Sequence, residues 1–181
     1  MERDTQPGFA LWITGLPASG KSVLARAVTD ELQRHQTNVT VLESDAMRKI
    51  FGTESYDEQT RDYFYGSLAF IGKVLTEHGI NVIFDATANR RAYRDRAREQ
   101  IPRFLEIHVD TPLEVCMRRD PKGIYKSGKE GAAQNVPGLQ ADYEPPLKPD
   151  LVIHGDRENP EASAASVMQL LKERRMLAAD L

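Results

Sequence analysis

Eight consecutive residues near the N-terminus match a pattern that binds nucleotide phosphates. They are Gly15, Leu16, Pro17, Ala18, Ser19, Gly20, Lys21 and Ser22, which fit G-x-x-x-x-G-K-[ST] in full. The glycines let backbone N–H groups turn inward around phosphates, and the N-terminus of the following helix adds positive potential. The lysine of this pattern contacts β- and γ-phosphate oxygens, and its hydroxyl residue ligates Mg²⁺. The segment predicts a loop that binds ATP and Mg²⁺, with an ordinary Gly-rich turn as the alternative.

Two carboxylates follow other apolar segments. Asp45 comes just after a predicted strand over 39–42, where a carboxylate can orient an acceptor hydroxyl, take up its proton and help to hold Mg²⁺. Its alternative role is to cap a short helix over 46–51. Asp85 ends the strand predicted over 80–84 in the manner of a Walker B motif. It predicts a metal or acceptor contact, with helix capping or loop solvation as the alternative.

Arginines near these positions are candidates for contacts with anions. Arg48 lies one helical turn beyond Asp45, so both side chains are expected to lean toward the same crevice, where Arg48 can clamp an anionic acceptor. Arg118 and Arg119 directly precede the segment 120–149. A guanidinium there can stabilise charge that develops on the transferred phosphoryl group, which makes Arg119 a candidate catalytic residue. A surface role for the Arg118 and Arg119 pair is the alternative.

The elements that must position these side chains alternate along the chain. Strands are predicted over 9–14, 39–42, 80–84, 104–109 and 151–153. Helices are predicted over 20–35, 56–78, 90–101, 111–119 and 160–176. Such alternation predicts an α/β, P-loop NTPase-type three-layer fold with a five-stranded parallel sheet. Ligands bind beyond the carboxyl ends of such strands, where the candidate residues lie.

The segment 120–149 has a different character, because it is rich in Gly, Pro and Lys and nearly free of periodicity. A structureless stretch of that length within a compact domain is normally a functional lid. We therefore predict a single P-loop kinase domain over residues 1–181, with a lid at about 120–149.

Composition limits the class of protein and its partners. A chain of 181 residues is the length of one domain, and a net charge of −3 argues against a nucleic-acid partner. Cys116 is the only cysteine, which predicts a reducing, cytoplasmic compartment. Met1–Gly8 has no apolar run, and no later apolar segment exceeds strand length, so neither a signal peptide nor a membrane span is predicted. The expected partner is a small-molecule acceptor.

Beyond these motifs, the sequence resembles the adenylylsulfate kinases (APS kinases), which use ATP to phosphorylate the 3′-hydroxyl of adenosine 5′-phosphosulfate (APS). The similarity covers about 9–155 and is most specific in three stretches. These are Val-Asp-Thr-Pro-Leu-Glu-Val-Cys at 109–116, Arg-Asp-Pro-Lys-Gly-Ile-Tyr-Lys at 119–126 and Tyr-Glu-x-Pro at 143–146.

The resemblance carries expectations that the residues alone do not give. It implies a strand order of 2-3-1-4-5, a homodimer and APS as the acceptor. It also implies that three residues of the lid lie near the nucleotide and the acceptor, namely Lys122, Ile124 and Tyr125.

The chain departs from the family pattern on the acceptor side. Where the family has Asp-Gly-Asp, this chain has 43–45 as Glu-Ser-Asp, which keeps the second carboxylate. The family's Gly-Phe-Ser is Gly-Thr-Glu at 52–54, and its Phe-Thr-Gly is Val-Pro-Gly at 136–138. Those two phenylalanines sandwich the acceptor's adenine in the family, so Thr53 and Val136 each forgo a stacking contact worth about 1–3 kcal/mol.

Charged residues also change in the acceptor region. The family's Asp-Arg-x-x-Asn is here Asp57-Glu58-x-x-Arg61, which exchanges a cation for an anion, although Arg61 can pair with a sulfate or phosphate of the acceptor. The family's Ile-Ser-Pro-Tyr-Arg is Thr-Ala-Asn-Arg-Arg at 87–91, more like other small-molecule P-loop kinases. Two alternatives to an APS kinase thus stay open. One is a kinase for another nucleotide-linked metabolite, a sugar or an alcohol, and the other is a regulatory subunit that binds nucleotide without turnover.

Overall fold

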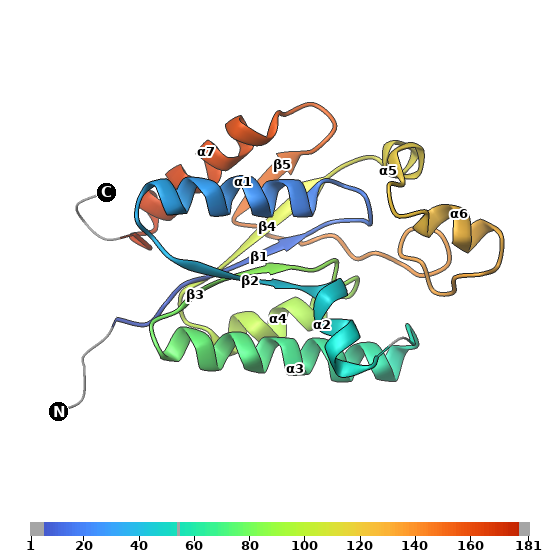
Figure 1. Ribbon diagram of the computed structural model, residues 1–181, viewed down its shortest axis with the longest axis horizontal. Coiled ribbons are helices and arrows are strands. Elements are labelled where there is room, and N and C mark those ends of the chain that lie inside the picture. Colours follow the sequence, from blue (N-terminus) through green and yellow to red (C-terminus); the bar gives the residue numbers. More distant parts are fainter. Residues whose placement is uncertain (1–5, 54, 178–181) are drawn as a thin grey trace.

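The computed structural model describes residues 6–53 and 55–177, so Met1–Thr5 of the N-terminal segment and Glu54 lie outside the described residues. The strands within these ranges are β1 (Ala10–Thr14), β2 (Val39–Glu43), β3 (Asn81–Asp85), β4 (Phe104–Asp110) and β5 (Leu151–His154). Their paired strands all run parallel, in the order β2-β3-β1-β4-β5 (Figure 1). The predicted five-stranded parallel sheet and the strand order are confirmed.

Helices cover both faces of this sheet (Figure 1). One face carries α1 (Lys21–Arg34) and α7 (Pro160–Glu173), and the opposite face carries α3 (Glu58–Glu77) and α4 (Arg91–Gln100). The short helices lie toward the end of the sheet where the strands finish, and they are α2 (Ser44–Phe51), α5 (Leu113–Arg119) and α6 (Ile124–Lys129). Among the described helices, none is long and apolar enough to cross a membrane.

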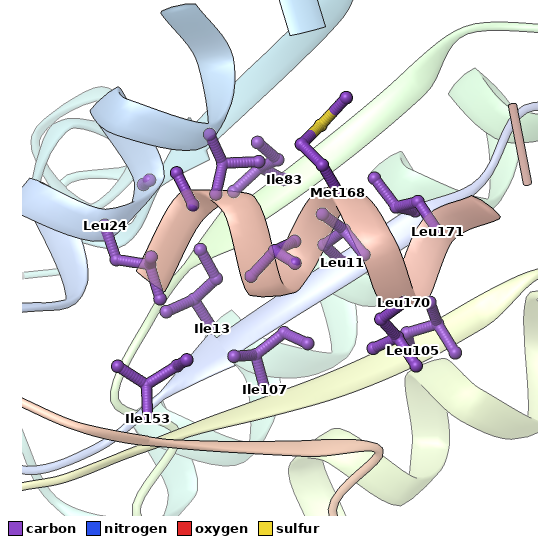
Figure 2. Close-up of a cluster of buried hydrophobic side chains, with 14 of the residues drawn as sticks. Leu11, Ile13, Leu24, Ile83, Leu105, Ile107, Ile153, Met168, Leu170 and Leu171 are labelled. Atoms are coloured by element: carbon purple, nitrogen blue, oxygen red, sulfur yellow. The ribbon is translucent and has the colours of Figure 1, made fainter. Parts of the chain in front are cut away.

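Each face of the sheet has its own hydrophobic core, because successive residues of a strand point to opposite sides. In the buried central strand β1, Leu11 and Ile13 pack beneath α1 and α7 (Figure 2). Trp12 faces α3 and α4, where its ring stacks on Phe84 with centroids 4.5 Å apart. Strand β1 is therefore fixed from both sides at the point where it enters the phosphate-binding loop.

Local side-chain bonds set the starts of two long helices. Asp57 caps α3 by accepting from the backbone N–H of Thr60 at 2.8 Å, so this helix begins two residues after the predicted start at 56. Asn159 caps α7 by accepting from the N–H of Ala162, and Pro160 occupies the first turn, as the sequence predicted.

The segment 120–149 is not free of secondary structure, and that expectation is wrong. Helix α6 forms within it because Gly123 adopts a left-handed conformation at its start and Asp120 accepts from the N–H of Lys126 at 2.9 Å. Tyr125 and Val136 pack with Cys116 in a small buried cluster. The apolar residues of this segment are too few to show a periodic pattern in the sequence. They nevertheless anchor the segment to the rest of the domain through this cluster.

Two glycines of α3 provide a matched test of packing. A Cβ at Gly72 would lie 2.1 Å from Cζ of the buried Phe84, whereas a Cβ at Gly66 would meet the flexible end of Arg96. Gly72→Ala is expected to lower the free energy of unfolding by about 1–3 kcal/mol, because the overpacking cost exceeds the gain in helix propensity. Gly66→Ala is expected to be neutral or stabilising by up to about 1 kcal/mol. Urea denaturation measures both, and equal effects would contradict this packing.

Candidate active site

The phosphate-binding loop connects β1 to α1, and its glycines are required by space and by backbone conformation. A Cβ at Gly15 would lie 2.6 Å from the carbonyl oxygen of Val109, and Gly20 has a left-handed φ of 111° at the start of α1. Leu16 and Ala18 turn outward and pack against the cluster around Cys116. The loop backbone is thereby left to face the phosphates.

Lys21 curls back over this loop. Its Nζ donates to the carbonyls of Gly15 at 3.1 Å and Leu16 at 2.8 Å, and only 8% of the residue is exposed. Burial lowers the pKa of Lys21 to about 8, and the nearby charge of Asp85 opposes part of that shift. Ser19 Oγ is buried and has no hydrogen-bond partner among the described residues. These donors in the loop are available to an anionic ligand.

A cavity of about 560 Å³ opens beside the loop, beyond the carboxyl ends of the strands. Most of the predicted site residues line it, namely Pro17, Lys21, Ser22, Asp45, Arg48, Arg61, Asp85, Lys122 and Ile124. They come from the loop, α2, α3, the end of β3 and the segment 120–149, so the fold brings together residues that are more than 100 positions apart in the sequence.

The two candidate carboxylates lie in different environments. Asp85 ends β3 and is 5% exposed, whereas Asp45 sits in the first turn of α2 with its side chain about half exposed. Asp45 does not cap α2, because the helix begins at Ser44 and Glu43 occupies the capping position. Instead, Asp45 accepts from Nζ of Lys122 at 2.6 Å. This hydrogen bond joins the segment 120–149 to the carboxylate and raises the pKa of Lys122.

Arg48 and Arg61 are buried cations that line the same cavity, with exposed fractions of 5% and 6%. Arg48 packs its guanidinium over the ring of Phe64 at 4.0 Å, and Arg61 donates to the carbonyl of Asn135 at 2.6 Å. Within the described residues neither forms an ion pair with a carboxylate. Burial and the charge of Arg48 lower the pKa of Arg61. Two such guanidiniums favour an anionic ligand.

Glu58 does not place its negative charge in this cavity, contrary to the expectation from the sequence. Its carboxylate pairs with Arg90 at the start of α4 and is absent from the lining of the cavity. That hydrogen bond raises the pKa of Arg90. Arg90 thereby neutralises the anion that replaces the family's arginine.

Of the site residues predicted outside the phosphate-binding loop, two are not brought into the cavity, namely Tyr125 and Arg119. Tyr125 is 1% exposed, and its hydroxyl donates to the carbonyl of Pro17 at 3.1 Å, so it supports the phosphate-binding loop from behind. Burial raises its pKa. Arg119 donates to the carbonyl of Gly155 at 2.8 Å and does not line the cavity. Its catalytic role stays a prediction.

Sequence reasoning missed several residues of the cavity wall, and Tyr56 is the one among them that offers an exposed aromatic ring. Tyr56 lies in the loop before α3 and lines the cavity, with 43% of the residue exposed. The only signal was an aromatic side chain next to Asp57, the residue that caps α3. By contrast, Phe64 and Tyr65 of α3 pack in the core.

A parallel sheet in this order, with a phosphate-binding loop after its central strand and carboxylates at the neighbouring strand ends, defines a P-loop kinase. The match to one family of that class is extensive. Residues 7–154 fit the family described as adenylylsulphate kinase. The chain belongs to the adenylylsulfate kinase family.

Relatives and solved structures agree with this placement. The adenylyl-sulfate kinase of Halothermothrix orenii is 35% identical over 170 residues, which cover 93% of this chain and 92% of that protein. The corresponding enzyme of Synechococcus sp. strain JA-3-3Ab is 35% identical over 166 residues, covering 91% and 94%. The APS kinase CysC of Mycobacterium tuberculosis, solved with AMPPNP and APS, superposes with a TM-score of 0.87 at 29% identity and covers 92% and 98%.

The lowered pKa of Lys21 predicts how nucleotide affinity depends on pH. Above a pH of about 8 the ammonium loses its proton, so the affinity for Mg·ADP is expected to fall by up to about tenfold between about pH 7 and about pH 9. Isothermal titration calorimetry of the wild type and Lys21→Met measures this. The variant should bind more weakly and lack the change with pH. A wild-type affinity that stays constant over this range would contradict the assignment, as would the same pH change in the variant.

Proposed function

We propose that this chain transfers the γ-phosphoryl group of ATP to the 3′-hydroxyl of APS, giving ADP and 3′-phosphoadenosine 5′-phosphosulfate. The observation that carries the proposal is the single cavity shared by Lys21, Asp45 and the buried Arg48 and Arg61. A phosphate-binding lysine, a carboxylate and two cations without carboxylate partners match a hydroxyl acceptor that carries negative charge. The names of the relatives, and the APS bound in the mycobacterial kinase, support APS as that acceptor.

Each side chain then has a role that its position allows. Asp45 orients the acceptor hydroxyl and takes up its proton, and Lys122 holds that carboxylate by a direct hydrogen bond. Lys21 contacts the transferred phosphoryl group. Arg48 and Arg61 bind the phosphate and sulfate of the acceptor and fix its hydroxyl near Asp45.

The oxygen ligands in the cavity suit Mg²⁺. This ion keeps several waters and substrate phosphates as ligands, so it needs only one or two protein groups. Ser22 supplies a hydroxyl, and Asp85 or Asp45 supplies a carboxylate. The described residues contain no group of three or more His, Cys, Asp or Glu that would hold a metal alone, in keeping with an ion that arrives with ATP. When bound, Mg²⁺ neutralises charge that develops on the phosphate oxygens.

A second candidate is a kinase for a different acceptor, such as another nucleotide-linked metabolite, a sugar or an alcohol. It is favoured by Thr53 and Val136, which provide no aromatic face where the family resemblance places two. A regulatory subunit without turnover is disfavoured, since Lys21, Ser22 and Asp45 are all present in one cavity. ADP release measured over a panel of acceptors separates these possibilities.

We infer two further properties of the whole protein. The family resemblance supports a homodimer, and the single cysteine supports a cytoplasmic location, because it suits a reducing compartment. Size-exclusion chromatography with light scattering tests the first, and cell fractionation tests the second.

The proposed role of Asp45 predicts the effect of a conservative change. Asp45→Asn is expected to lower kcat with APS by about 10²- to 10⁴-fold, because the amide cannot take up the hydroxyl proton. Because Asp45 is also a candidate Mg²⁺ ligand, the affinity for ADP is measured with EDTA present, where it should change little. Asp62→Asn is the matched control, since Asp62 pairs with Arg96 on the surface, away from this cavity. Coupled-enzyme measurement of ADP release gives the rates.

Two outcomes contradict separate parts of this proposal. If the wild type releases ADP with another acceptor and not with APS, the acceptor is wrong. If Asp45→Asn is as active as Asp62→Asn, the role of Asp45 is wrong.

A further inference from the structure

Tyr56 lines the cavity beside the phosphate-binding loop, here called the acceptor cavity, and its ring is not part of the hydrophobic core. It is 43% exposed, and its hydroxyl makes no hydrogen bond among the described residues. The other tyrosine of the cavity wall, Tyr65, is 5% exposed. The hydroxyl of Tyr65 accepts from the N–H of Ala88, and its ring stacks on Tyr93 at 4.9 Å. Tyr56 is therefore the ring in this wall that has a face to offer a ligand.

The ring is held in place by stacked charged and aromatic groups. Cζ of Arg48 lies 4.6 Å from the centroid of Tyr56, and Cζ of Arg61 lies 5.7 Å from it. Arg48 is fixed in turn by the buried ring of Phe64, at 4.0 Å. Cation–π contacts of this kind are strongest when the cation is removed from water, as both arginines are here. A loop residue is thus connected to the core through Arg48.

This arrangement places an aromatic face next to two cations. A nucleotide has the matching chemistry, since it carries a planar base and an anionic group a few ångströms apart. The positions where the family resemblance expects aromatic partners do not supply a ring, because one is Thr53 and the other is Val136, which is 3% exposed in the cluster around Cys116. Tyr56 offers a ring from a different position in the chain.

We propose that Tyr56 is a specificity-determining residue whose exposed ring stacks on the base of a nucleotide acceptor, with the acceptor's anionic group at Arg48 and Arg61. The proposal rests on the proposed function in taking the acceptor to be a nucleotide. It adds the residue that recognises the base. Base–aromatic stacking of this kind corresponds to about 5- to 150-fold in affinity.

Binding to the ADP-loaded protein tests the proposal without requiring turnover. Saturating Mg·ADP fills the phosphate-binding loop, and calorimetry then compares AMP with ribose 5-phosphate, which carries the same anionic group and no base. The wild type should bind AMP at least about fivefold more tightly. Tyr56→Ala should bring the two affinities close together, whereas Tyr56→Phe should keep the difference.

A matched control and a second measurement keep the outcomes distinct. Tyr63→Ala removes an exposed tyrosine of α3 that does not line the acceptor cavity, and it should leave the preference for AMP unchanged. Unchanged affinity for Mg·ADP shows that each variant is folded. Equal wild-type affinities for AMP and ribose 5-phosphate would overturn the role of Tyr56, and so would a preference that survives Tyr56→Ala. If that preference depends on Tyr56 but APS supports no ADP release, the proposed acceptor fails and the role of Tyr56 stands.

Discussion

Backbone N–H groups can bind a phosphate only if the loop that carries them is tight and rigid. Contacts from several elements of this structure keep the loop in that shape. Gly15 passes so close to the carbonyl of Val109 that no Cβ fits. Thr111 donates to the carbonyl of Ser19 at 2.8 Å, and a Cβ at Gly155 would lie 2.5 Å from the same oxygen. Because Val109 belongs to β4 and Gly155 follows β5, the loop keeps its shape only if β4 lies beside β1 and β5 lies beside β4. The shape of the phosphate-binding loop therefore depends on the order of the strands in the sheet.

The segment 120–149 depends on a second anchor at its C-terminal end. Arg94 is 1% exposed and donates to the carboxylate of Glu106 at 2.6 Å, to the carbonyl of Glu144 at 2.7 Å and to the carbonyl of Ala88. A buried ion pair contributes little net stability, since desolvation offsets the attraction. Its effect here is geometric, because one guanidinium ties the returning chain to β4 and to the turn after β3. Lys122 on Asp45 forms the corresponding contact at the other end.

On the acceptor side of the site, an acidic residue lies outside the cavity and two cations line it. The negative charge of Glu58 is satisfied by Arg90, so it leaves the cavity to Arg48 and Arg61. Those cations are buried against aromatic rings rather than carboxylates, which keeps them available to an anion and holds Tyr56 at the cavity wall. A site that lacks the expected aromatic pair can in this way offer cations to an anionic group of the acceptor and a ring to its base.

The phosphate-binding loop, the five parallel strands and the carboxylates at their ends follow from the sequence itself, because each is a contiguous pattern: a motif, an apolar run, or a polar residue directly after one. The resemblance to a family added the strand order. Only the tertiary structure decided where side chains in irregular segments point. Glu58 turns to Arg90, Tyr125 supports Pro17 from behind and Arg119 reaches Gly155. These partners lie between 32 and 108 positions away in the sequence, so long-range packing, which no local pattern encodes, determines which group each side chain meets.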